Sequence, residues 1–419
     1  MSRMKLQIIS RKAIKPSSST PKHLQNFKLS IWDKRLRPVY GIIIFFYHCN
    51  ANPKDHDQIL SLFFKRSRFL QKSLSKTLVH YYPLAGRLND ESIECNDEGA
   101  HFVEARIDCH LSTFLNQPDF NVLEQFNPAF DPNLPSGCML ATQVTLFNCG
   151  GIAIGVSPSH KLLDGSSLAT FIQSWVSLTT IEGCNNLVSP NPIFVDSSFS
   201  PSSGLLRMPT PSIRFGGSLV IKRFVFPASK ISQLKETTSS GKQYISYVDS
   251  VLSLIMKSAI SASRSLSKPS SGPYLLFQMV NMRKRLRQPL PRNTMGNISW
   301  NAAIEIKENQ MELNELADEI REKPLPMRKS TKGDDPYRCS SLCGFPLYKI
   351  DFGWGKPSWV TSPVLRCKNF ILLHQTKDGN GIEAWICLDE KEMSQFERDQ
   401  DLLAFAHTNP CVVTHYCRL

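Results

Sequence analysis

The segment from Gln143 to Leu178 constrains the fold more than any other part of this chain. Gln143–Phe147 and Ile152–Val156 have the composition of two strands, and the Gly-containing turn between them predicts a hairpin. A loop follows, and then an apolar stripe at helical spacing: Leu168, Phe171, Ile172, Trp175 and Leu178. His160 in this loop is therefore predicted to lie at the end of a β-sheet, where functional side chains are commonly found.

Strand and helix patterns recur along the rest of the sequence. The first half predicts a buried strand at Gly41–Tyr47, a helix over 59–78 that ends near Tyr82, and short strands around Ile93 and Phe102. The second half predicts a helix that begins near Ser246, where Asp249 gives capping-box spacing, and a further helix at Met311–Glu322. Three further segments are predicted to be strands, the last two flanking an Asp-Gly turn: Lys222–Phe226, Phe370–Leu373 and Ile382–Cys387.

These patterns favour an α/β (α+β) protein of two domains. A Pro- and Ser-rich stretch over 188–213 has no sustained period and is interpreted as the connection between the domains. The predicted boundaries are residues 1–190 for an N-terminal domain, 191–215 for a crossover linker and 216–419 for a C-terminal domain.

Composition limits the classes of partner. No apolar run approaches the roughly 18 residues needed to span a bilayer, so no membrane segment is expected. Lysine and arginine exceed aspartate and glutamate by 49 to 36, but the charges are scattered. The densest cluster, Arg283–Arg287, comes without a nucleic-acid signature. A small phosphorylated ligand such as coenzyme A, or a merely solvated surface, is therefore favoured over nucleic acid.

The 12 cysteines have no metal-site spacing, so we expect reduced thiols, no metal and a cytoplasmic protein. Two minor alternatives come from the chain ends. Residues 1–32 carry several lysines and arginines but no aspartate or glutamate, which resembles the bias of a plastid transit peptide. Cys417-Arg418-Leu419 loosely resembles a peroxisomal signal.

His160 and Asp164 form an HxxxD motif between the predicted hairpin and helix. An imidazole with a pKa of about 6.5 can act as a general base near neutral pH. Asp164 also suits a helix N-cap, so an orienting role for it is favoured over a proton-transfer dyad. A second copy, His374 and Asp378, lies in a predicted strand and turn, and we expect no chemistry from it.

A second unusual segment is Asp351-Phe-Gly-Trp-Gly355. Glycines on both sides of Trp354 permit uncommon backbone angles. The segment is compatible with a tight turn around a buried aromatic side chain or with an indole N–H that serves as a donor.

The HxxxD motif at His160 and the distant DFGWG motif at Asp351 together resemble the plant BAHD acyl-CoA-dependent acyltransferases. Further segments carry the resemblance over most of the chain: Ser73–Leu88, the 148–155 hairpin, Asn281–Leu286, Met295–Asn297 and Gly381–Trp385. The sequence is most similar to the branch of vinorine synthase-like alkaloid and terpenoid O-acetyltransferases.

This resemblance implies two domains of chloramphenicol-acetyltransferase-like fold with a solvent channel between them. It implies a monomer with acetyl-CoA as co-substrate and no permanently bound cofactor, which acylates a small-molecule alcohol with His160 as general base. By similarity, Asp164 pairs with Arg283, and Asp351 has a structural role away from the histidine. The residues that bind the co-substrate and the donor to the oxyanion are not identified by the sequence.

The sequence also departs from the family between residues 298 and 350. This stretch is shorter than in most members, and Ser341-Leu342-Cys343-Gly344 stands where the family commonly has Ser-Trp-Cys-Arg. Two alternatives therefore stay open beside the acetyltransferase: a non-catalytic or truncated relative that only binds acyl-CoA, and a transferase that uses an aromatic acyl donor.

Overall fold

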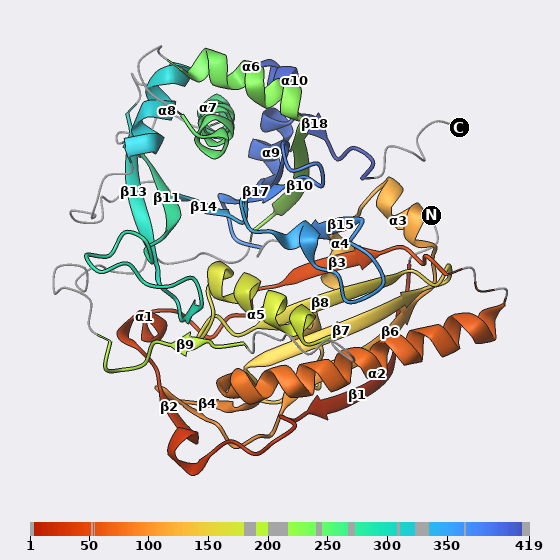
Figure 1. Ribbon diagram of the computed structural model, residues 1–419. Helices are drawn as coiled ribbons and strands as arrows, with labels where there is room; N and C mark the ends of the chain where they lie inside the picture. The colour runs from red at the N-terminus through yellow and green to blue at the C-terminus, as the bar shows by residue number, and fades with distance from the viewer. Residues whose placement is uncertain are drawn as a thin grey trace.

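Two large β-sheets, stacked one above the other in Figure 1, form the frame of the protein. Helices cover the outer face of each sheet, and a layer of side chains fills the space between the sheets. The computed structural model describes these residues: 4–51, 53, 55–179, 190–199, 217–239, 245–266, 273–307, 311–322, 335–363 and 366–412.

The first sheet is built largely from the N-terminal part of the chain. Its strand order is β1-β6-β7-β8-β3-β15, and only the β6–β7 pair is parallel. The bounds of these strands are β1 Leu6–Ile14, β3 Ile43–Tyr47, β6 Ala100–Ile107, β7 Leu140–Phe147, β8 Ile152–Pro158 and β15 Trp359–Thr361. Every residue of β7 and β8 is buried because both faces of the sheet are covered, including the polar side chains of Thr142, Gln143 and Thr145.

Two helices pack on one face of this sheet. α2 (His56–His80) and α5 (Gly165–Ser177) contribute apolar side chains to a single core cluster with β3, β7 and β8. The predicted helices at these positions are confirmed. Shorter elements complete this half: η1 Lys22–Leu24, β2 Asn26–Lys28, α1 Ile31–Lys34, η2 Tyr82–Ala85, β4 Arg87–Asn89, β5 Ser92–Glu94, α3 Leu111–Asn116, α4 Phe120–Glu124 and η3 Pro128–Phe130.

The second sheet comes from the C-terminal part, in the order β13-β11-β14-β16-β17-β10-β18. Its strands are β10 Leu219–Phe226, β11 Tyr274–Asn281, β13 Ser299–Ile306, β14 Tyr337–Ser341, β16 Phe370–Gln375, β17 Ile382–Asp389 and β18 His407–Thr408. The helices that cover it are α6 Ala228–Thr238, α7 Tyr247–Leu266, α8 Leu313–Glu322, α9 Glu390–Phe396 and α10 Gln400–Phe405. At the start of α7, the two residues with capping-box spacing contact each other: Ser246 Oγ accepts from Asp249 N at 3.1 Å and donates to Asp249 Oδ2 at 2.6 Å.

Segments of the second half reach into the first. β15 follows the DFGWG motif and pairs with β3, so a strand from near residue 360 extends the N-terminal sheet, as Figure 1 shows. β9 (Ile193–Phe194) likewise pairs in parallel with β12 (Thr294–Met295). The domain boundaries inferred from the sequence remain a prediction, and most of the expected linker lies outside the described residues.

Three details differ from the sequence-based expectations. The strand around Phe102 is eight residues long rather than short, because it pairs along its whole length with β1, which was not predicted. Gly41 and Ile42 precede β3 instead of belonging to it. The 298–350 stretch supplies two strands that were not predicted, β13 and β14, and β14 lies between β11 and β16.

Candidate active site

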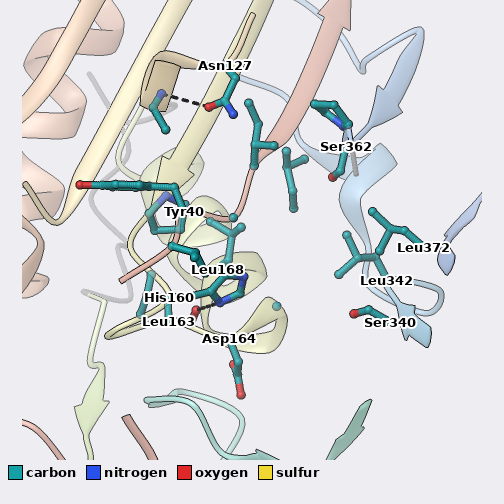
Figure 2. A pocket seen from close by; sticks show the side chains of 18 of the residues that line it. Tyr40, Asn127, His160, Leu163, Asp164, Leu168, Ser340, Leu342, Ser362 and Leu372 are labelled. Carbon is teal, nitrogen blue, oxygen red and sulfur yellow. Dashed lines mark hydrogen bonds between the residues drawn. The ribbon is translucent and has the colours of Figure 1, made fainter. Parts of the chain in front are cut away.

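His160 lies in the loop between β8 and α5, on the wall of a cavity of about 470 Å³ that both sheets line (Figure 2). Its backbone N–H donates to Val39 O at 2.8 Å. Its ring Nδ1 lies 3.0 Å from Leu163 O. Because a carbonyl oxygen only accepts, Nδ1 carries the hydrogen of the neutral ring, and Nε2 keeps its lone pair. The loop thus holds the imidazole in the tautomer that a general base requires.

Burial lowers the pKa of His160 below its ordinary value of 6.5. Desolvation disfavours the imidazolium, whereas the hydrogen bond to Leu163 O and the charge of Asp164 act in the opposite direction. The ring is therefore neutral at pH 7 and able to accept a proton.

Gly41 lies directly against Nε2. A Cβ atom built on Gly41 would lie 2.9 Å from Nε2 and 3.4 Å from Cδ2 of His160. Backbone hydrogen bonding fixes this glycine, since its N–H donates to Pro158 O at 3.2 Å. The absence of a side chain at this position keeps space free beside the basic nitrogen.

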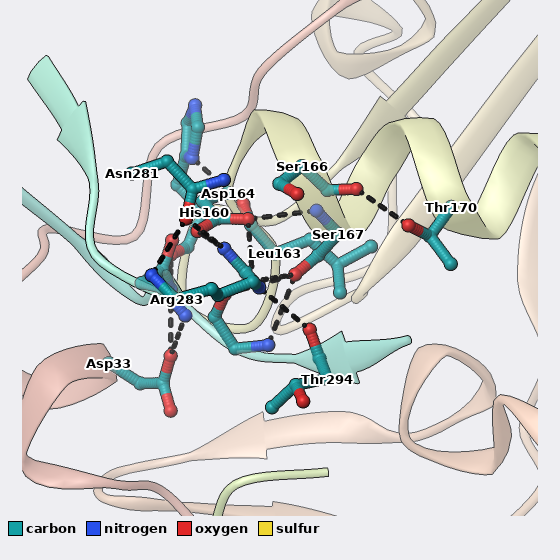
Figure 3. Close-up of polar contacts among 12 residues, drawn as sticks. Asp33, His160, Leu163, Asp164, Ser166, Ser167, Thr170, Asn281, Arg283 and Thr294 are labelled. Carbon is teal, nitrogen blue, oxygen red and sulfur yellow. Dashed lines mark hydrogen bonds and ion pairs between the residues drawn. The ribbon is translucent and has the colours of Figure 1, made fainter. Parts of the chain in front are cut away.

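Asp164 performs two structural tasks at the start of α5. It is the N-cap residue, and its Oδ1 accepts from Ser167 N at 2.8 Å. Its carboxylate also forms a bidentate ion pair with Arg283, with Nη1–Oδ2 and Nη2–Oδ1 distances of 2.8 and 3.1 Å. Figure 2 shows the carboxylate turned away from the imidazole, and Figure 3 shows it in the hydrogen-bonded network around Arg283. This geometry orients the loop and leaves Asp164 without a hydrogen bond to His160.

Arg283 ties the two halves of the molecule together behind the histidine. Besides Asp164, it donates to Thr294 O, to Gly296 O and to Ser167 Oγ at distances between 2.8 and 3.1 Å. The guanidinium is 3% exposed, so these bonds form in a medium of low polarity, where each one restricts the loop strongly.

A second buried network holds the backbone of His160. Asn297 Nδ2 donates to His160 O at 2.6 Å and to Asp33 Oδ1 at 2.8 Å. Asp33 is fully buried, and burial raises its pKa to about 6 although Ser30 and Asn297 donate to it. Sequence reasoning assigned Asp33 and Asn297 no role. The capping-box spacing of Ser30 and Asp33 was a visible signal for α1, but nothing local connects either residue to His160.

The walls of the cavity are mainly apolar. Side chains from the two sheets and from α5 contribute to them, and Figure 2 shows several of these residues around an open space above His160. The apolar lining consists of Val39, Ile42, Ile43, Ala129, Phe130, Pro158, Leu163, Leu168, Leu342, Pro363, Phe370 and Leu372. Such a lining suits a hydrophobic organic ligand.

The DFGWG segment lies away from this cavity. Asp351 Oδ1 accepts from Gly353 N at 2.8 Å and from Gly355 N at 2.9 Å, and both glycines have φ near +100°. Only glycine adopts this backbone conformation readily. The rings of Phe352 and Trp354 stack with centroids 5.7 Å apart and pack into the core of the first sheet. Asp351 therefore closes a turn that anchors aromatic side chains.

The second HxxxD copy lies in ordinary secondary structure. His374 is a buried residue of β16 opposite Glu383, and burial lowers its pKa to about 4. Asp378 accepts from Thr376 Oγ1 and from backbone N–H groups of the following turn. Neither residue lines the cavity.

Among the described residues, no group of three or more His, Cys, Asp or Glu side chains has the arrangement of a metal site. In the same part of the chain, no helix is long and apolar enough to cross a membrane.

Comparison with known proteins agrees with this architecture. The Transferase family model matches residues 4–324 and 321–403. Akuammiline synthase 1 from Alstonia scholaris is 37% identical, over 96% of this chain and 98% of the relative. Stemmadenine O-acetyltransferase from Catharanthus roseus is 34% identical, over 94% and 96%. The crystal structure of vinorine synthase superposes with a TM-score of 0.82 at 30% identity and covers 98% of this chain and 100% of that chain.

The two-sheet fold and a cavity lined by a neutral histidine define an acyltransferase of the chloramphenicol-acetyltransferase-like class. The chain belongs to the Transferase family, the BAHD acyl-CoA-dependent acyltransferases.

Proposed function

We propose that this protein transfers an acetyl group from acetyl-CoA to a hydroxyl group of a plant alkaloid or terpenoid. The names of its relatives support this substrate class, since they include stemmadenine O-acetyltransferase and limonoid 7-O-acetyltransferase. The apolar cavity wall is compatible with such a polycyclic acceptor.

One observation carries the mechanism: His160 presents an unprotonated Nε2 to the cavity while Nδ1 is engaged with Leu163 O. In the proposed reaction, Nε2 takes the proton of the acceptor hydroxyl as its oxygen attacks the thioester carbonyl. The tetrahedral intermediate then collapses, the carbon–sulfur bond breaks, and the imidazolium returns the proton to the sulfur of coenzyme A. The products are the acetyl ester and a free thiol, and the histidine is regenerated.

Asp164, Arg283 and Asp351 act indirectly in this proposal. The ion pair of Asp164 with Arg283 holds the loop that carries His160. The Asp351 turn supports the aromatic core beneath the first sheet. None of the three is required to exchange a proton with substrate.

The test is release of coenzyme A thiol from acetyl-CoA and from aromatic acyl-CoA donors, with and without a panel of alkaloid and terpenoid alcohols. We expect release from acetyl-CoA that depends on an acceptor. H160A should lower kcat by about 10²- to 10⁴-fold, because this is the usual contribution of a general base.

H374Q is the matched control, because it alters the histidine of the other HxxxD copy, which lies outside the cavity. It should retain acceptor-dependent thiol release. Full activity of folded H160A would refute the general-base assignment. Acceptor-dependent thiol release from aromatic acyl-CoA donors alone would identify the protein as an aromatic acyltransferase. Coenzyme A binding without any turnover would indicate a non-catalytic relative.

A further inference from the structure

We propose that the side-chain amide of Asn127 is a preset hydrogen-bond donor for a ligand in the cavity. It would bind an oxygen or nitrogen atom of the substrate that lies away from the reacting hydroxyl. This inference rests on the proposed function and adds a requirement to it: the ligand carries a second polar atom at a fixed position.

Hydrogen bonds fix the orientation of the Asn127 side chain. Oδ1 accepts from Ala129 N at 3.0 Å, as the N-cap of η3, and lies 2.9 Å from Ser157 Oγ. A backbone N–H only donates, so the atom facing Ala129 must be the amide oxygen. The NH₂ group therefore occupies the other side of the carboxamide, and Figure 2 shows this nitrogen on the side of the cavity.

The NH₂ group has no partner of its own within the described part of the chain, although Asn127 is only 7% exposed and lines the cavity. Nearly all buried polar groups in proteins are hydrogen-bonded, to protein, to water or to a ligand. In a cavity with mainly apolar walls, a ligand atom that accepts this bond is favoured over one that cannot. The amide is thus suited to select among ligands.

Two other polar side chains of the cavity are already engaged. Tyr40 OH donates to Cys138 O, and Arg366 pairs with Glu124, with its guanidinium about half exposed. Ser340 and Ser362 also line the cavity, but a hydroxyl group rotates and its direction is not preset. Among the described residues of the cavity, Asn127 therefore offers, besides His160, a polar group whose direction is set by protein contacts before a ligand binds.

The position of Asn127 indicates which part of the ligand it contacts. Ser157 Oγ lies within hydrogen-bond distance of both Asn127 Oδ1 and Gly41 O, so Asn127 and the glycine beside Nε2 share one wall. In Figure 2, Asn127 and His160 lie at different ends of the displayed pocket. The bound atom is then remote from the reacting hydroxyl. It belongs either to the acceptor alcohol or to an amide carbonyl of the pantetheine arm of acetyl-CoA.

Two substitutions distinguish the contribution of the NH₂ group from that of the rest of the Asn127 side chain. N127D keeps an oxygen that accepts from Ala129 N and replaces the NH₂ group by an acceptor. N127L removes all hydrogen bonding at similar size. Circular dichroism and thermal unfolding establish whether each variant is folded. If N127L does not fold, N127D alone serves for the test, because its carboxylate can still cap η3.

The measurement is equilibrium binding by calorimetry, which needs no turnover. The probes are coenzyme A and two rigid alcohols, epiandrosterone and 5α-androstan-3β-ol, which share a 3-hydroxyl and differ in the 17-oxo group. If the acceptor supplies the atom, the unmodified protein prefers the oxo alcohol on the order of tenfold, and both variants lose this preference. If the pantetheine arm supplies it, both variants weaken coenzyme A binding by a similar factor.

The inference is overturned if the unmodified protein does not discriminate between the two alcohols and coenzyme A binds equally well to all three proteins. Failure of the proposed acetyl transfer is a separate result, since thiol release and the H160A comparison detect it independently of these binding constants.

Discussion

At the scale of single residues, two neighbours define the imidazole of His160. Leu163 O binds Nδ1 and so sets the tautomer, while Gly41 leaves space beside Nε2. The contact with Leu163 O leaves Nε2 as the basic nitrogen, and the missing side chain at Gly41 keeps that nitrogen accessible. Two predictions follow from these contacts.

The pH dependence of catalysis should report the lowered pKa of His160. A general base is active when neutral, so the acid limb of kcat/KM should have its midpoint below the ordinary histidine pKa of about 6.5. Below the lowered pKa, kcat/KM should fall about tenfold per pH unit, as the ring becomes protonated. The check is chromatographic quantification of the acetylated product between pH 5 and pH 8. An acid limb with its midpoint above about pH 6.5 would contradict the prediction.

G41A should impair catalysis without disturbing the backbone. The φ angle of Gly41 lies outside the left-handed region, so alanine is permitted there. Its methyl group would lie 2.9 Å from Nε2 and must displace either the ring, at the expense of the Leu163 contact, or the incoming hydroxyl. We expect kcat/KM to fall on the order of 10²-fold, as for other small displacements of reacting groups. In an H160A background the same change should have almost no further effect.

At the scale of elements, the N-terminus of α5 is the junction that positions the catalytic loop. Asp164 caps the helix, and Arg283 from the other half of the chain neutralises the capping carboxylate. Both side chains are at least nine-tenths buried. A buried pair of this kind is sensitive to the loss of one partner, because the remaining charge is left uncompensated.

R283M should therefore lower the free energy of unfolding by about 3–5 kcal/mol. D164N combined with R283M should recover part of this loss, because asparagine also caps helices and carries no charge. Thermal and urea unfolding measure both effects. K257M is the control, since Lys257 and Asp401 form an exposed pair whose loss should cost less than about 1 kcal/mol. Equal destabilisation by R283M and K257M would show that the buried ion pair contributes no more to stability than the exposed one.

At the scale of the whole molecule, the cavity exists because the two sheets are held at a fixed separation. Apolar side chains of β3 and β17 meet in one cluster between the sheets. Within it, Glu383 of β17 accepts from Trp359 Nε1 and Thr361 Oγ1 of β15, and it pairs with Arg223 of β10 at 2.7 Å. This carboxylate therefore links a strand of the first sheet to two strands of the second.

E383Q should weaken that link. Arg223 is 4% exposed and would lose its counter-charge, so we expect stability to fall by about 3–5 kcal/mol. Since the cavity depends on the same interface, coenzyme A and acceptor affinities should weaken together. Calorimetric binding and thermal unfolding of the same preparations check both expectations. An unchanged unfolding midpoint would contradict the role given to Glu383.

Much of the fold was predictable from local patterns. Helical spacing located α2 and α5, and turn residues located the β7–β8 and β16–β17 hairpins. β1 was missed, because an exposed edge strand has little apolar signal and is defined mainly by its pairing with β6. β15 was missed too, since three residues after a glycine-rich turn are too few to show a period.

The candidate active site likewise has some features that could be predicted from local sequence and others that could not. The HxxxD spacing occurs twice, and the predicted hairpin, loop and helix around His160 distinguished it from His374. The N-cap preference of aspartate predicted that Asp164 would begin a helix. Both predictions depend on neighbouring residues in the sequence. Other features arise between segments far apart in the chain: Asp164 and Arg283 are separated by 119 residues, and Asp33 and Asn297 by 264. The free side of Nε2 and the direction of the Asn127 amide also depend on which segments pack together. Short-range propensity specifies where a helix or strand begins, but only the packing of the whole chain determines which side chains meet.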